Sequence, residues 1–286
     1  MLVTTMAAFD EHRKYLFGIA YRMLGSAADA DDMVQEAFIR WEATDRSVVS
    51  SPRAFLSTIV TRACLDRLKN AHTVRVDYVG TWLPEPICTE GDEEIDVVEA
   101  AESISQAFLV LLESLSPLER AVHLLHDVFD YTHEDIARII GRDAATCRKL
   151  LERARKDLVA RRPRFAPTKQ AHREMVDRFA AAVVKGDVAA LERLLVDDVQ
   201  AASDGGRKAV AMQKPIMGRA AVARFFGGLA RRAAADGSFS IMEINGWAAM
   251  VVRVAGRPFS VIQLETDGEA IYAIRSTLNP DKLSRM

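Results

Sequence analysis

Six polar and basic side chains between positions 146 and 156 have the residue types that bind nucleic acid. Arginine and lysine donate hydrogen bonds to guanine edges and to phosphates, and threonine bonds either group. The six are Thr146, Arg148, Lys149, Arg153, Arg155 and Lys156. Their concentration within three helical turns predicts a surface that contacts duplex DNA.

A helix-turn-helix is the element that we expect to position them. Serine, proline and glutamate within 116–119 form a capping box, which predicts a helix ending near position 129. A short helix is expected over 132–141, where Gly141 would end it at a tight turn. The basic helix would begin near Asp143.

The basic helix has two faces. Its apolar stripe, which would pack on the preceding helices, consists of Cys147, Leu150, Leu151, Ala154 and Leu158. The opposite side, which would enter a major groove, consists of Thr146, Lys149, Arg153 and Lys156. Arg148 and Arg155 flank it and would hold phosphates. The alternative is an ordinary solvated face of a helical bundle.

Charge is unevenly distributed along the 286 residues, a length that suits two or three domains. The formal net charge is only -2. Residues 138–162 nevertheless hold nine lysines and arginines against three acids, and residues 76–106 hold nine acids and no base. The segregation of charge, rather than its sum, therefore favours a nucleic-acid partner.

The remaining composition indicates a cytoplasmic protein. Cys64, Cys88 and Cys147 lie far apart and lack metal-binding spacing, so we expect reduced thiols and neither metal nor cofactor. No apolar run approaches the length of a membrane span, and the N-terminus lacks the pattern of a signal peptide. We therefore expect no membrane partner.

Three helices are expected before position 75. The first two occupy 6–42 and are separated by Gly25-Ser26, and the third covers 52–71. Trp41 could stack on a base, but on its helix we expect it to lie in the core or to face polymerase. One face of the third helix carries basic and polar groups suited to capturing unstacked bases, namely Arg53, Thr58, Thr61, Arg62, Asp66 and Lys69.

On these motifs the chain resembles bacterial sigma factors of the extracytoplasmic-function (ECF) group. Residues 31–38, Asp-Asp-Met-Val-Gln-Glu-Ala-Phe, resemble the region 2 helix that docks on RNA polymerase. Residues 52–68 resemble the helix that meets the -10 element, and residues 116–158 resemble region 4, which reads the -35 element. The resemblance implies an alternative sigma factor whose partners are core RNA polymerase and promoter DNA. The polymerase contacts that it implies are Asp31, Asp32, Gln35 and Glu36.

Residues 76–106 are expected to link the two helical regions. The run from Glu90 to Glu102 is densely acidic and suits a disordered tether, whereas the family resemblance favours a strand that threads the polymerase's RNA channel. Trp82-Leu83-Pro84-Glu85-Pro86 places an apolar pair beside two prolines, which suits a segment that docks on another surface.

The last 120 residues predict an α+β cone with a curved antiparallel sheet. Helices are expected at 168–185, 188–195 and about 219–232, and a hairpin of 199–203 with 209–212. Strands are expected at 239–244, 247–254, 258–265 and 270–277, separated by glycine-containing turns. The expected domains are region 2 at 1–75, the linker at 76–106, region 4 at 107–162 and the cone at 168–286.

The cone resembles the SnoaL-like fold, and a sigma factor with this extension resembles the SigJ-type subgroup. The closer match rests on 82–86, on Asp-Gly-Gly-Arg-Lys at 204–208, where Arg207 replaces the subgroup's third glycine, and on Asn-Pro-Asp-Lys-Leu at 279–283. We expect these stretches to lie together and to regulate activity in cis, replacing a separate anti-sigma protein. The regulatory contacts are Trp82, Leu83, Pro84, Asp204, Gly205, Gly206, Lys208, Asn279, Pro280, Asp281, Lys282 and Leu283.

Enzymatic function is not expected. No histidine follows His172, and most acids beyond it stand at caps or turns. Asp204 with Lys208 is the one pair suited to acid-base work. The alternatives are a small-ligand sensor or residual enzyme in the cone, or, for the whole chain, a stand-alone helix-turn-helix regulator that binds duplex DNA without polymerase.

Overall fold

The computed structural model of the protein describes residues 2–76, 78, 80–90, 104–161, 167–229 and 236–286. They form two compact units, which are described separately. Unit 1 comprises the described residues within 1–76 and 108–162, and unit 2 those within 77–92, 104–107 and 163–286. The acidic run from Glu90 to Glu102, for which a path through the polymerase was expected, lies outside the described residues from position 91 onward.

Unit 1 begins with three packed helices, α1 (Leu2–Leu24), α2 (Ala27–Glu42) and α3 (Pro52–Val76), with a short 3-10 turn, η1 (Arg46–Val48), before the third. The break predicted at Gly25-Ser26 is confirmed, because the Ser26 side chain caps α2 by accepting a hydrogen bond from Asp29 N. Trp41 is 2% exposed, so its predicted place in the core is also confirmed.

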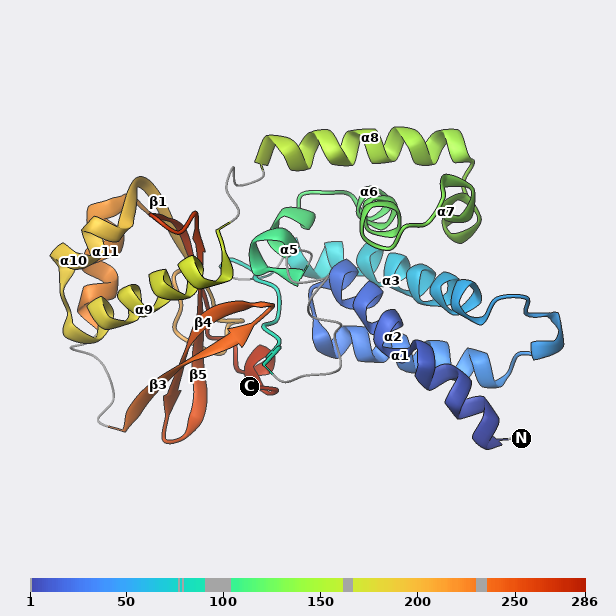
Figure 1. Ribbon diagram of the computed structural model, residues 1–286, viewed down its shortest axis with the longest axis horizontal. Coiled ribbons are helices and arrows are strands. Elements are labelled where there is room, and N and C mark those ends of the chain that lie inside the picture. Colours follow the sequence, from blue (N-terminus) through green and yellow to red (C-terminus); the bar gives the residue numbers. More distant parts are fainter. Residues whose placement is uncertain (1, 77, 79, 91–103, 162–166, 230–235) are drawn as a thin grey trace. The chain divides into compact units, whose positions relative to one another are not determined.

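The second half of unit 1 consists of α5 (Gln106–Leu112) from position 108 onward, α6 (Pro117–His123), α7 (His133–Ile140) and α8 (Ala144–Arg161) (Figure 1). Ser116 and Glu119 form the predicted capping box at the start of α6. The last turn of that helix, η2 (Leu124–Val128), is π-helical, which the sequence did not reveal. Gly141 ends α7 at φ +67°, as its place at the turn predicted.

The apolar stripe of α8 packs where it was predicted to pack. Cys147, Leu150 and Leu151 are buried in one cluster with Val122, Leu125, Ile136 and Ile139 from the helices before them. Ala154 and Leu158 are buried too. The helix-turn-helix is therefore held by its own small core, and the opposite side of α8 remains at the surface.

Unit 2 contains a six-stranded sheet in the order β2-β1-β6-β5-β4-β3. Its strands are β1 (Leu195–Asp204), β2 (Ile216–Met217), β3 (Gly237–Ile244), β4 (Trp247–Val254), β5 (Arg257–Thr266) and β6 (Ile271–Thr277). The last four confirm the predicted strands. These four strands pair antiparallel, as predicted, but β1 and β6 pair in parallel, so the sheet as a whole is mixed. Hydrophobic pattern identifies strands but not the direction of a partner distant in sequence.

The predicted hairpin of 199–203 with 209–212 was also wrong. Residues 209–212 form no strand, because the turn folds back at once through hydrogen bonds from Lys208 N and Ala209 N to Gly205 O. Met212 N then donates to Ser203 Oγ over 2.6 Å, and β1 pairs instead with β2. The Ser203 side chain thus makes the contact to Met212 that a backbone hydrogen bond of the predicted hairpin would have made.

Three helices pack against the sheet, α9 (Lys169–Lys185), α10 (Val188–Leu194) and α11 (Arg219–Leu229), and a 3-10 turn, η4 (Pro280–Leu283), ends the chain (Figure 1). Thr168 and Asp187 cap the first two, and the predicted positions of these helices are confirmed. Positions 230–232 of the predicted third helix lie outside the described residues. Phe179 and Phe226 meet edge to face at 5.3 Å in the core between helices and sheet.

Among the described residues, none of the helices combines the length and the apolar character needed to cross a membrane.

Replacing Phe179 with alanine should lower the free energy of unfolding by about 3–5 kcal/mol, because Phe179 is completely buried and its loss leaves a cavity. Phe239 is the matched control: it lies on β3 with 44% of its surface exposed, and Phe239→Ala should cost less than about 1 kcal/mol. Urea unfolding of the full chain, followed by circular dichroism and tryptophan fluorescence, measures both. Equal effects would contradict the described core.

Candidate functional site

The outward side of α8 presents the basic residues predicted for it. Arg148, Lys149, Arg153, Arg155 and Lys156 are all exposed. Thr146 is half-buried, and both its backbone N and its Oγ1 donate to the Asp143 carboxylate, over 2.8 and 2.6 Å. Thr146 therefore helps to begin the helix, and the five basic side chains make up the open surface.

Three of these arginines have acidic neighbours from the preceding helices, which sequence reasoning missed. Arg155 donates from Nε to Asp127 Oδ2 over 2.9 Å and from Nη2 to Oδ1 over 2.5 Å. Nε of Arg153 lies 3.0 Å from Glu119 Oε1. Arg148 is only loosely paired, with Nη1 at 3.9 Å from Glu134. The partners lie 14 to 34 positions away, beyond the reach of a helical-spacing argument.

Asp127 is the most heavily bonded of these acids. Nδ1 of His126 lies 2.8 Å from Oδ1, and Nδ1 of His123 lies 2.9 Å from Oδ2. Burial alone would raise the pKa of Asp127, but the hydrogen bonds from Arg155 and His126 and the charge of His123 outweigh it and lower the pKa to about 2. Asp127 is therefore a carboxylate at neutral pH.

The predicted DNA-facing side of α3 is partly engaged within unit 1. Arg62 donates from Nε to Ile139 O over 2.8 Å and from Nη2 to Arg138 O over 3.0 Å, at the carboxyl end of α7. The guanidinium of Arg53 lies 3.9 Å from the centre of the Tyr15 ring. Both cations thus contact protein in this arrangement.

Thr61, which was predicted to face DNA, is buried in this closed arrangement of unit 1. Its side chain has no exposed surface, because α3 packs against α1, α2, α6 and α7 and is covered on more sides than its apolar stripe suggested. Thr58 is half-buried and its Oγ1 donates to Ala54 O of its own helix. Asp66 and Lys69 are exposed and paired with each other at 2.9 Å.

A tyrosine strengthens the packing of α3 on the helix-turn-helix. Tyr131, just before α7, donates its hydroxyl hydrogen to Ser57 Oγ on α3 over 2.8 Å. Its oxygen accepts a hydrogen bond from the Tyr15 hydroxyl on α1 at 3.2 Å. Arg120 of α6 adds a further bond to Met23 O at 2.7 Å. Unit 1 is therefore one closed body.

The four residues expected to contact polymerase share one stripe of α2. Asp32 and Gln35 are exposed, while Asp31 and Glu36 are half-buried. Glu36 pairs with Arg40 one turn later at 2.5 Å. Their spacing of one, four and five residues keeps all four on the same side of the helix.

Unit 2 holds a buried polar cluster built from the three motifs that were predicted to lie together, and their proximity is confirmed. Asp204 at the end of β1 has no exposed surface. Its carboxylate accepts hydrogen bonds from the Tyr78 hydroxyl, from Leu83 N at 2.9 Å and from Lys282 Nζ at 2.7 Å. The cluster therefore joins the linker segment, the turn after β1 and the last turn of the chain.

Lys282 is the cation of this cluster. Its Nζ also donates to Leu83 O and lies 4.1 Å from the centre of the Trp82 ring. Asn279 donates from Nδ2 to the Tyr78 hydroxyl over 3.2 Å, while burial and the bond to Asp204 raise the pKa of Tyr78. Lys208 and Asp281, by contrast, form an exposed pair at 2.7 Å.

The turn after Asp204 tolerates Arg207 in place of a third glycine. Arg207 adopts the left-handed backbone at φ +61° although it carries a side chain. Gly206, at φ +58°, is more strictly required, since a Cβ there would lie 2.2 Å from the side chain of Asn279. Sequence reasoning missed Tyr78, which precedes the tryptophan-containing motif by four positions.

Two known protein families match the two helical regions of this chain. The sigma-70 region 2 family matches residues 8–73, and the sigma-70 region 4 family matches residues 105–158. The ECF RNA polymerase sigma factor SigJ of Mycobacterium tuberculosis is 34% identical over 98% of this chain and 93% of its own. The chain belongs to the extracytoplasmic-function family of RNA polymerase sigma factors.

Other matches agree with this assignment. The crystal structure of SigJ superposes with a TM-score of 0.79 at 33% identity, covering 98% of both chains. The probable sigma factor SigI of the same organism is 34% identical over 66% of each chain. This sigma factor is thus an alternative sigma factor that directs RNA polymerase to promoters, and it carries a C-terminal SnoaL-like domain with a mixed sheet.

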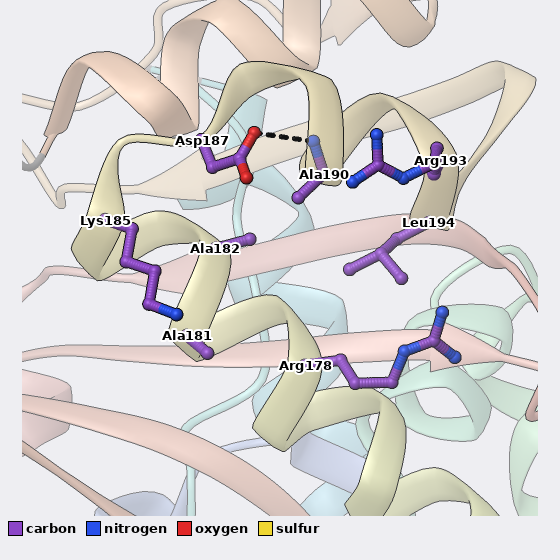
Figure 2. Close-up of a pocket in the computed structure, with 8 residues that line it drawn as sticks. All are labelled: Arg178, Ala181, Ala182, Lys185, Asp187, Ala190, Arg193 and Leu194. Atoms are coloured by element: carbon purple, nitrogen blue, oxygen red, sulfur yellow. Dashed lines mark hydrogen bonds between the residues drawn. The ribbon is translucent and has the colours of Figure 1, made fainter.

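A shallow hollow of about 290 Å³ lies between α9 and α10 of this domain. Figure 2 shows Arg178, Lys185 and Arg193 around a floor of alanine side chains and Leu194. Asp187, the one acid in its lining, accepts a hydrogen bond from Ala190 N and so serves as a helix cap.

Lys282→Met should destabilise the sigma factor by about 3–5 kcal/mol, because it leaves the Asp204 carboxylate buried without its cation. The matched control is Lys208→Met, which breaks a pair exposed by more than half and should cost less than about 1 kcal/mol. Chemical denaturation of the two full-length variants measures the difference. Indistinguishable midpoints would show that the cluster does not hold the linker segment as described.

Proposed function

We propose that the two helical regions of this sigma factor divide promoter recognition between α8 and α3. The exposed face of α8 would read the -35 element through Arg148, Lys149, Arg153, Arg155 and Lys156, with Thr146 at its start. The observation that carries this assignment is that all five basic side chains stand open on a helix-turn-helix whose apolar stripe is fully used in its core.

On α3, the -10 element would be met by Arg53, Thr58, Arg62, Asp66 and Lys69. The α2 stripe of Asp31, Asp32, Gln35 and Glu36 would bind core RNA polymerase. We assign region 2 to 1–75, the linker to 76–106, region 4 to 107–162 and the regulatory domain to 168–286. Because promoter DNA and polymerase are cytoplasmic in bacteria, we place the protein there as well.

Recognition by both regions requires unit 1 to open. The -10 and -35 elements are named for their positions upstream of the transcription start, so they lie about 25 base pairs apart. At ~3.4 Å per base pair, this separation is about 85 Å along the DNA. Arg62 on α3, however, is hydrogen-bonded to the carboxyl end of α7. Helices in direct contact cannot hold both elements, so polymerase binding must separate them.

We further propose that the C-terminal domain regulates this transition in cis and is not an enzyme. The buried cluster fastens Tyr78 and Leu83, which follow α3 in the chain, to Asp204 and Lys282 of that domain. Thr89 N adds a bond to Glu243 O on β3 at 2.9 Å. By binding the linker at Tyr78, Leu83 and Thr89, the domain would set the length of linker that is left to span the distance between region 2 and region 4.

Transcription with added core RNA polymerase tests the proposal. The full-length protein should bind its promoters tightly only with core polymerase, and the charge-removing pair Arg148→Ala with Lys149→Ala should weaken that binding about tenfold or more, since each lost phosphate or base contact reduces affinity. Val159→Ala, at an exposed site on the same helix, is the control. Genome-wide run-off transcription identifies the promoters, and a gel shift compares binding with and without core.

Tight binding to intact duplex without polymerase would instead support a stand-alone regulator. For regulation in cis, Lys282→Met should change the transcript yield per polymerase, while Lys214→Met, at an exposed site outside the cluster, should leave it unchanged. Equal yields from both variants would contradict the role assigned to the cluster.

A further inference from the structure

The acidic partners of Arg153 and Arg155 touch the same part of each guanidinium group. Asp127 occupies Nε and Nη2 of Arg155, and Glu119 lies beside Nε of Arg153. A guanidinium carries five N–H donors, so this approach leaves the Nη1 end of each group available. In the part of the chain that the structure describes, Nη1 of Arg155 makes no hydrogen bond. That end can still grip a phosphate with two donors.

The carboxylates of Glu119 and Asp127 are themselves held in place, whereas that of Glu134 beside Arg148 is not. The Glu119 side chain is 15% exposed, and its Oε2 accepts hydrogen bonds from N and Oγ of Ser116 in the capping box. The Asp127 side chain is 21% exposed and is contacted by His123 and His126. The Glu134 side chain is 69% exposed, and its Oε1 lies 3.9 Å from Nη1 of Arg148, which is too far to hold that arginine in one position.

The two fixed arginines stand on opposite flanks of α8. They precede and follow Ala154, which is completely buried in the middle of the apolar stripe. At about 100° per residue, positions 153 and 155 therefore project to either side of the helix. A helix lying in a major groove has a phosphate backbone along each flank.

We propose that Asp127 and Glu119 are positioning residues, which hold Arg155 and Arg153 with their free ends directed at the phosphates on the two sides of the -35 major groove. The inference rests on the proposed function of α8. Ordering a free arginine on DNA costs much side-chain entropy, and a side chain already ordered by a neighbour avoids this cost. Asp127 lies in the π-helical turn η2, which places its carboxylate within hydrogen-bond distance of Arg155.

Charge masking by the same acids would have the opposite effect on DNA binding. A carboxylate beside an arginine reduces the positive potential that attracts DNA. If this masking dominated, removal of the acid would strengthen DNA binding. Positioning predicts the reverse, a weaker complex.

The experiment uses holoenzyme reconstituted from the full-length protein and core RNA polymerase on one of its promoters, with binding measured at several salt concentrations. Asp127→Asn should weaken binding about three- to tenfold, the range expected for one newly mobile side chain. Arg155→Ala should weaken it at least as much and reduce the salt slope by about one. In the Arg155→Ala background, Asp127→Asn should have no further effect, because its role acts through that arginine.

Glu134→Gln, at the loosely paired site, is the matched control and should change affinity less than twofold. Thermal unfolding checks that each variant is folded. Tighter binding by Asp127→Asn, or a loss that persists without Arg155, would overturn the positioning role while leaving α8 as the reading helix. Unchanged binding by Arg155→Ala would overturn both the positioning role and the phosphate contact assigned to that residue.

Discussion

The packing of α3 on the start and end of α7 is the constraint on which the rest of the account depends. Arg62 donates to two carbonyls at the carboxyl end of α7, and Tyr131 ties α3 and α1 to the segment before it. These bonds connect the helix proposed for the -10 element to the motif proposed for the -35 element. Under the proposed function, the chain must therefore adopt two arrangements, one closed on itself and one extended along DNA. The closed form would use Arg62, a cation that the open form needs, so the two states would compete for that side chain.

Two further groups of charged residues hold side chains and linker segments in defined positions. In unit 1, two acids whose side chains are 15% and 21% exposed partner Arg153 and Arg155, so these arginines are ordered while the basic side chains of α8 stay exposed among the described residues. In unit 2, the buried Asp204 and Lys282 fasten the segment that follows α3. A buried ion pair is weak evidence for stability but strong evidence for a defined geometry when several hydrogen bonds complete it. The acids beside the α8 arginines and the Asp204–Lys282 pair therefore fix the positions of side chains and of the linker more than they add to the stability of the domains.

Much of this could be predicted from local sequence. Capping residues such as Ser116, Thr168 and Asp187, and turn glycines such as Gly141, act within a few positions, so helix limits followed from them. The motifs containing Trp82, Asp204 and Lys282 could be brought together because the family resemblance marked them as a set. What could not be predicted depends on partners distant in sequence: the parallel pairing of β1 with β6, the burial of Thr61 and the acids beside Arg153 and Arg155. Periodicity reports which face of a helix is apolar, but not how many neighbours will cover it.

The most direct test of the central claim is the distance between the two recognition regions before and after polymerase binding. Spin labels at Val48→Cys and Arg142→Cys, both exposed positions, in a background with Cys88→Ser, allow this distance to be measured by pulsed electron paramagnetic resonance. The free protein should give one short distance, which lengthens by tens of ångströms in holoenzyme, as the spacing of the promoter elements demands. An unchanged distance in transcriptionally active holoenzyme would contradict the account.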